Sequence, residues 1–166
     1  MRLLDWLRNW SANYARSPFK RTVCACKDCV SFCKTNPGAL VPSDVERIAQ
    51  RLVELGLIEQ KADVTRFLRS SRATTVYDVD DEKETHIRKI VPARDQKGRC
   101  VFLDASDRCR IHGMSPFGCA YFDAHMEQAE IDRRRLWAYQ QIRSSSRYQS
   151  MRQTLQSVEG RKAGAS

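Results

Sequence analysis

Residues 24–33 read Cys24-Ala25-Cys26-Lys27-Asp28-Cys29-Val30-Ser31-Phe32-Cys33, which places four thiols within ten residues of a 166-residue chain. Short spacings of this kind lower the entropic cost of bringing several thiolates onto one cation. If Cys29 begins a helical turn, Cys29 and Cys33 share one helix face, while Cys24 and Cys26 approach from the preceding loop. The stretch predicts a small domain organised around a thiolate-bound metal, although Cys24 and Cys26 could also form a thiol-exchange pair.

Three further cysteines follow in the second half of the chain, at Cys100, Cys109 and Cys119. We expect residues 99–103 and 108–112 to form two short strands of a β-hairpin, with Leu103 opposite Arg108. Side-chain alternation then makes Cys100 and Cys109 diagonal neighbours on one face, roughly 7–8 Å apart. A turn at 116–118 could return Cys119 to them. Taken singly, each of these cysteines could equally be a small buried hydrophobe.

The spacing C-x-C-x2-C-x3-C bears on which metal is bound. Structural zinc favours two C-x2-C pairs separated by a dozen or more residues, whereas this run is closer to the C-x2-C-x2-C-x3-C pattern of bacterial iron–sulfur proteins. We therefore favour an iron–sulfur cluster, with zinc as the alternative. In the bacterial pattern the fourth cysteine serves another cluster, so the thiols could divide between two centres. A [4Fe–4S] cluster would leave three thiolates, to which His112 or His125 could add a fourth ligand.

The order of several motifs resembles the YkgJ-type cysteine-cluster family, described as a zinc- or iron-chelating domain with a CxxCxxCC-like signature. The motifs are the four-cysteine run, residues 42–49 (PSDVERIA), residues 100–104 (CVFLD), residues 109–112 (CRIH) and residues 115–119 (SPFGC). The resemblance implies that all seven cysteines belong to the metal-binding set. It also implies kinship with iron–sulfur enzymes that methylate flagellin lysines. The chain is similar to a divergent member, because the first block lacks adjacent cysteines and Ala120 stands where the family usually has arginine.

Local patterns predict a helix-rich α+β fold. Ser43 and Glu46 form a capping box for a helix over 44–55 with an apolar stripe, and Gly56 follows as its terminator. Further predicted elements are helices over 2–16, 60–70 and 123–143, a loop over 75–84 and a strand over 86–91. We expect a metal-binding domain over 1–125 and a C-terminal helix with a basic tail over 126–166, whose last twenty residues lack regular structure.

The net charge of +9 is concentrated at the C-terminal end, where residues 133–166 hold eight basic residues and one acid. Such an arm could bind an acidic protein or nucleic acid, with Trp137, Tyr139 and Tyr148 available for stacking. The simpler interpretation packs these aromatic side chains on the domain and leaves the arginines in water. The sequence has neither a membrane-spanning apolar run nor a secretory leader, which predicts a cytoplasmic protein.

Three functions remain open from the sequence. The first is a metal-binding protein whose cluster serves electron transfer or redox sensing. The second is a metal-dependent enzyme related to the lysine methylases, which predicts a pocket beside the cluster lined by polar groups other than cysteine. The third is a zinc-stabilised interaction module that binds nucleic acid through its basic tail. The sequence gives neither a substrate nor an oligomeric state.

Overall fold

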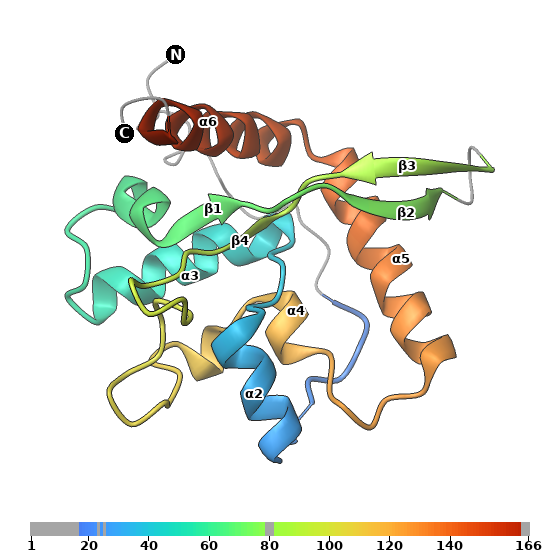
Figure 1. Cartoon of the computed structure of the whole chain (residues 1–166), viewed down its shortest axis with the longest axis horizontal. Coiled ribbons are helices and arrows are strands. Elements are labelled where there is room, and N and C mark those ends of the chain that lie inside the picture. Colours follow the sequence, from blue (N-terminus) through green and yellow to red (C-terminus); the bar gives the residue numbers. More distant parts are fainter. Residues whose placement is uncertain (1–16, 23, 25, 79–81, 164–166) are drawn as a thin grey trace.

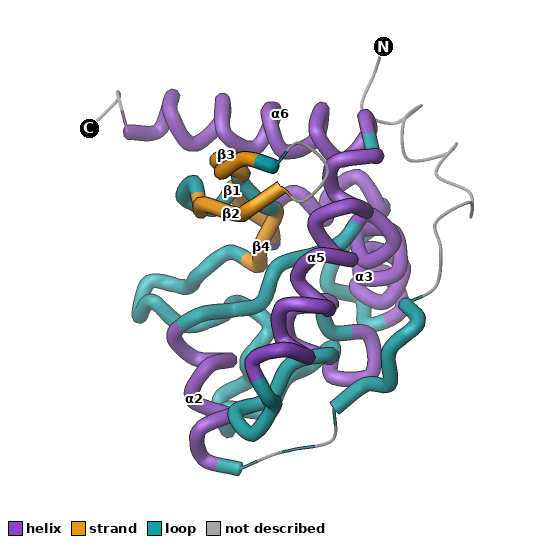
Figure 2. The backbone as a smooth tube through the Cα atoms, turned by 90° about the vertical axis from the view of Figure 1, so that its right-hand side faces the viewer, coloured by secondary structure: helices purple, strands orange, loops and turns teal. Residues whose placement is uncertain are grey.

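The computed structural model describes residues 17–22, 24, 26–78 and 82–163, so the predicted helix over 2–16 lies outside the described residues. Figures 1 and 2 show α6 lying along one side of the small strands, with α3 beside them and α2 and α4 on the opposite side. The predicted helix-rich α+β class is confirmed. The elements in chain order are α2 (Lys27–Thr35), α3 (Pro42–Glu54), η1 (Lys61–Phe67), β1 (Leu68–Ser70), β2 (Thr74–Asp78), β3 (Lys83–Ile87), β4 (Ile90–Pro92), η2 (His112–Met114), α4 (Phe117–Ala120), α5 (Gln128–Ser144) and α6 (Ser146–Ala163).

Helix α3 is the central helix and matches the prediction except at its start. Its apolar stripe is buried, and Gly56 follows its last turn with a φ of 65°, a left-handed conformation that glycine adopts without strain. The predicted capping box of Ser43 and Glu46 is wrong, because Pro42 already occupies the first turn. Asp44 fills the role instead, and its carboxylate accepts the backbone N–H of Val41 at 2.9 Å.

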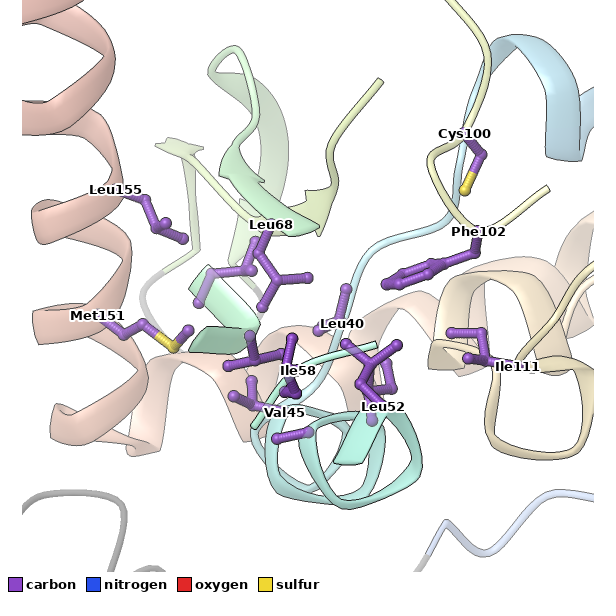
Figure 3. Close-up of a cluster of buried hydrophobic side chains, with 14 of the residues drawn as sticks. Leu40, Val45, Leu52, Ile58, Leu68, Cys100, Phe102, Ile111, Met151 and Leu155 are labelled. Carbon is purple, nitrogen blue, oxygen red and sulfur yellow. The ribbon is translucent and has the colours of Figure 1, made fainter. Parts of the chain in front are cut away.

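The hydrophobic core joins α3 to distant parts of the chain. Figure 3 shows Val45 and Leu52 of α3 facing Leu68, while Met151 and Leu155 of α6 close one side. The other side is completed by buried residues of the cysteine-bearing loop, namely Cys100, Phe102 and Ile111. The second cysteine segment is therefore fixed by the same core that holds the helices.

Two small antiparallel sheets replace several predicted elements. Strand β1 pairs with β4, so the predicted helix over 60–70 is a 3-10 helix that ends at Phe67 and continues as a strand. The predicted loop over 75–84 is wrong, because β2 and β3 pair there from Thr74↔Ile87 to Asp78↔Lys83. The threonines, valine and tyrosine of β2 favour strand structure, and the acidic charge gathers near the turn. The predicted strand over 86–91 is divided between β3 and β4, which pair with different partners.

Only one isolated bridge joins the two expected strands of the predicted hairpin over 99–112, and Cys100 bridges instead to Arg94. Leu103 pairs with Cys109 rather than with Arg108, which shifts the expected register by one residue. The loop therefore gains Arg108, and Asp107 within it has a φ of 58°. Asp104 closes the loop, because its carboxylate accepts the N–H groups of Ser106 and Arg108 at 2.8 and 2.9 Å.

The basic C-terminal segment is helical through α5 and α6, where the sequence analysis expected the last twenty residues to lack regular structure. Its aromatic side chains face the domain. The Tyr148 hydroxyl is fully buried, donates to the Leu40 carbonyl at 2.8 Å and accepts the Ile90 N–H at 2.7 Å. Trp137 packs on Phe117 with ring centroids 5.0 Å apart. None of the described helices combines the length and apolar character needed to cross a bilayer.

Candidate metal centre

Three of the predicted ligands form a compact group, which we call the tight site: Cys24, Cys26 and Cys29. Their sulfur atoms all lie within 4.8 Å of one another, and each residue is half-buried. Cys26 immediately precedes α2 and Cys29 lies in its first turn. Thiolates around one tetrahedral ion bound at about 2.3 Å would be about 3.8 Å apart, so this spacing fits a single ion.

The tight site is held against the segment that follows α4. Thr22 donates its N–H to the Ala120 carbonyl at 2.8 Å and its hydroxyl to the Phe122 carbonyl at 3.4 Å. The N–H of Ala124 then points at the Cys29 sulfur at 3.3 Å. These contacts bring residues 120–125 alongside the first cysteines, although nearly one hundred positions separate them in sequence.

The electrostatics of the tight site favour one thiolate. The backbone amide and thiol of Cys29 and the side chain of His125 lower the pKa of Cys26 to about 6. Burial and the neighbouring thiols Cys26 and Cys24 raise the pKa of Cys29 to about 11, against the Ala124 N–H. A cation would therefore meet a preformed thiolate at Cys26 and would displace the proton from Cys29.

The remaining predicted ligands form a second group, which we call the wide site: Cys33, Cys100, Cys109 and Cys119. All six pairs among these thiols interact electrostatically, so the four residues lie near one another. No three of them lie within 4.8 Å of one another. Cys33 is therefore grouped with the three later cysteines, whereas the sequence analysis grouped it with Cys24, Cys26 and Cys29.

Two glycines make the close approach that positions Cys119. The Gly118 N–H donates to the Ala39 carbonyl at 2.8 Å, and the Gly38 N–H donates to the Cys119 sulfur at 3.1 Å. A methyl group on Gly38 would lie 2.1 Å from the Gly118 carbonyl carbon, and one on Gly118 would lie 2.4 Å from the Ala39 nitrogen. Only glycine permits this crossing. The sequence analysis had recognised Gly118 only as a turn residue.

Asp44 also holds the start of α3 against the start of α4. One of its oxygens accepts the N–H of Phe117, the first residue of α4, at 2.7 Å, and the other pairs with Arg47. The carboxylate is 1 % exposed, so the N-terminus of α3 and the start of α4 are tied together inside the protein. Sequence patterns could flag Asp44 only as a residue of the first helical turn, because its second partner lies 73 positions away.

Burial dominates the chemistry of the wide site. It raises the pKa of Cys100 to about 11, and it raises the pKa values of Cys33, Cys109 and Cys119 as well. Mutual repulsion between neighbouring thiolates acts in the same direction. Four converging thiols that resist ionisation by themselves suit a multiply charged soft-metal centre, which supplies the compensating charge.

The two histidine candidates differ in position. His125 contacts Cys26, so it adjoins the tight site. His112 is exposed, and its carbonyl accepts the Arg21 guanidinium at 2.8 Å. Its imidazole takes no part in the described contacts of either cysteine group. Of the two, the structure brings only His125 to a thiol.

A large cleft borders both sites. Its cavity has a volume of about 920 Å³, and Cys29, Cys33 and Cys119 contribute to its wall. The rest of the wall comes from α2, the loop over 36–41, the four strands and the segments that join them, α4 with the segment after it, and α5. The sequence analysis could not select these residues, because strands and helices far apart in sequence enclose the space.

Comparison with known proteins supplies one match. The CxxCxxCC family model, described as "Putative zinc- or iron-chelating domain", matches residues 25–144. No curated protein and no solved structure gives a significant match. The matched span includes six of the seven cysteines and both histidine candidates. The chain therefore belongs to the CxxCxxCC family of zinc- or iron-chelating domains and is a metal-binding protein.

Proposed function

We propose that the chain holds two different centres, an iron–sulfur cluster at the wide site and a single zinc ion at the tight site. The wide-site ligands are Cys33, Cys100, Cys109 and Cys119, and the tight-site ligands are Cys24, Cys26 and Cys29 with His125 as the fourth. The cluster serves electron transfer or redox sensing, and the zinc ion fixes the start of α2.

The observation that carries this proposal is the difference in sulfur spacing. The tight site fits the separation of ligands around one tetrahedral ion, and a Cys3His set is a common structural zinc site. The wide-site thiols interact pairwise but are further apart. Thiolates of an iron–sulfur cluster bind different iron atoms, so they are spaced more widely than ligands of a single ion.

Metal, sulfide and visible-absorption analysis of anaerobically purified protein tests the assignment. We expect iron, acid-labile sulfide and a brown colour together with zinc. Cys100→Ser should abolish the colour and most of the iron while zinc remains, and Cys24→Ser should reduce zinc while the colour remains. Colourless wild-type protein with zinc alone would refute the cluster, and loss of both metals in equal proportion from both variants would refute the division.

The histidines provide a matched pair for the tight site. His125→Ala should lower zinc affinity about 10-fold or more, because it removes a ligand from the set, and His112→Ala should leave it unchanged. Competition with a chromogenic chelator measures both affinities. The redox use is tested by dithionite and mild oxidant, which should bleach and restore the visible absorption reversibly. Absorption that does not respond to reductant would remove the redox function.

A cluster-dependent enzyme is the second candidate, and a specific observation favours it. Such an enzyme requires a pocket beside the cluster with polar groups other than cysteine, and the cleft of about 920 Å³ next to Cys33 and Cys119 meets that requirement. The nucleic-acid alternative receives less support, since Trp137 and Tyr148 pack inward and Arg133 and Arg134 both pair with Glu130.

A further inference from the structure

The cleft beside the wide site carries an unusual charge. Five basic residues contribute to its wall: Arg69, Arg72, Lys89, Arg94 and Arg135. The only acidic residue among the described wall residues is Asp123. The excess of basic residues makes the space attractive to an anion.

These basic residues converge from separate parts of the chain. Arg69 belongs to β1, Lys89 joins β3 to β4, and Arg135 belongs to α5. The arrangement therefore differs from an ordinary solvated helix face, where cations project outward along one element. Cations from several elements that line one concave space surround a bound ligand with positive charge.

Two of the cations are partly buried without adequate compensation. The Arg69 Nε atom is buried and has no hydrogen-bond partner within the part of the chain that the structure describes. Burial lowers the pKa of Arg69, and the like charges of Arg94 and Arg72 lower it further, against the nearby Glu159 carboxylate. That carboxylate already accepts the Ser70 N–H at 3.2 Å.

Lys89 repeats the pattern on the neighbouring strand segment, where its carbonyl accepts the Ser71 N–H at 2.7 Å. Its side chain is half-buried, and burial together with the charge of Arg135 lowers its pKa. No carboxylate forms a salt bridge with Lys89 among the described residues. Arg135 itself contacts Asp132 only at 3.6 Å. Placing like charges together costs free energy unless a counter-charge binds between them.

We propose that this cleft binds a small molecule that carries phosphate groups. Arginine guanidinium groups suit phosphate oxygens through paired, charge-assisted hydrogen bonds. The two cationic groups, Arg69 with Arg72 and Lys89 with Arg135, fit a ligand with more than one anionic group. Apolar wall residues such as Phe122 and Ile131 leave room for a non-polar portion. The inference deepens the proposed function and rests on it, because it gives the metal centre a neighbouring ligand.

Binding of inorganic pyrophosphate to the metal-loaded full-length protein tests the proposal by calorimetry. We expect saturable binding that weakens as salt rises. Citrate is the control that carries carboxylate groups and no phosphate. It should bind at least about 10-fold more weakly than pyrophosphate. Equal or tighter binding of citrate would overturn the phosphate assignment, and so would tighter binding of a short single-stranded oligonucleotide.

Paired variants locate the site. Arg72→Gln changes an exposed residue, so the fold should persist, and Lys89→Gln removes a positive charge from the second cationic group. Each should weaken pyrophosphate binding about 10-fold. Arg66→Gln removes the same charge from an exposed arginine that is absent from the described wall of the cleft, and it should leave binding unchanged. Equal affinities in all three variants would overturn the proposed location.

Metal content keeps this test separate from that of the proposed function. Arg72→Gln and Lys89→Gln should retain full iron, zinc and visible absorption while they lose pyrophosphate affinity. If the wild-type protein binds pyrophosphate but contains no cluster, the metal assignment fails and the anion site stands. If it contains the cluster but does not bind pyrophosphate, the anion site alone fails.

Discussion

The tight and wide sites are built in opposite ways. The three thiols of the tight site lie within six residues of one another in sequence, and the structure gathers them within 4.8 Å. The wide site takes its thiols from α2, from both sides of the loop around Asp104, and from α4. A local site needs little of the fold to form, whereas a site built from distant segments exists only when the core is correctly packed.

Cys29 and Cys33 make the contrast clearest. They lie one helical turn apart on α2, yet they belong to different groups. Cys29 faces the segment after α4, and Cys33 faces the thiols of the later loop and of α4. One short helix can therefore contribute to two groups of thiols, because side chains at i and i+4 point to the same side but reach different neighbours along the axis.

The largest expected effect comes from removing Asp44, the buried residue that ties α3 to the start of α4, where Cys119 of the wide site lies. Asp44→Ala should lower the free energy of unfolding by about 3–5 kcal/mol, because it leaves Arg47 unpaired and two buried N–H groups without an acceptor. Urea unfolding measures the change. Glu46→Ala is the matched control: its contact with Lys61 is a surface salt bridge at 3.4 Å, whose loss should cost less than about 1 kcal/mol. Equal effects would show that Asp44 is not a structural link.

Thiol reactivity compares the sites directly. In metal-free protein at pH 7, Cys26, with a pKa of about 6, is largely thiolate, while Cys100, with a pKa of about 11, is protonated. Iodoacetamide should therefore modify Cys26 at least about 100-fold faster, even after allowing for the lower nucleophilicity of an acidic thiol. Mass spectrometry of timed samples gives both rates. Raising the pH should narrow the difference between the two modification rates. Comparable rates at pH 7 would contradict the difference in pKa between Cys26 and Cys100.

Backbone crowding offers a selective way to damage the wide site. Gly118→Ala forces the new methyl group against the Ala39 backbone, which should lower stability by about 1–3 kcal/mol and displace Cys119. Iron and visible absorption should fall, while zinc at the tight site remains. Gly113→Ala is the control, because a methyl group there meets no atom within 4 Å. Wild-type metal content in Gly118→Ala would show that the crossing does not position Cys119.

The smallest expected effect concerns the loop that carries Cys100 and Cys109. The N–H of Arg108, then that of Ser106, and the Arg108 charge lower the pKa of Asp104. A lowered folded-state pKa adds stability above the ordinary carboxyl pKa, and this stability is lost as pH falls through the lowered value. NMR titration of the Asp104 carboxyl should show the depressed pKa, and Arg108→Gln should raise it slightly. An ordinary pKa in the wild-type protein would contradict the loop geometry.

The sequence predicted a helix or strand correctly where contacts between residues near in sequence define that element. The apolar stripe and terminal glycine of α3 were correct, since helical periodicity reports one buried face. The capping box was wrong because α3 already begins at Pro42, so Asp44 and not Glu46 accepts the N–H at its start. The hairpin of β2 and β3 was missed because the acids near its turn suggested a solvated loop, although Thr74–Tyr77 favour a strand.

The sequence by itself predicted that this chain chelates metal, because clustered cysteines carry that chemistry in any fold that lets them meet, and the family match supports the prediction. It also allowed for a division into four thiolates and three with a histidine. Tertiary structure decided which thiol joins which group, placed His125 rather than His112 beside a cysteine, and enclosed the cationic cleft. The physical reason is that thiol convergence and cavity shape depend on contacts between segments up to about one hundred residues apart, which spacing along the chain does not encode.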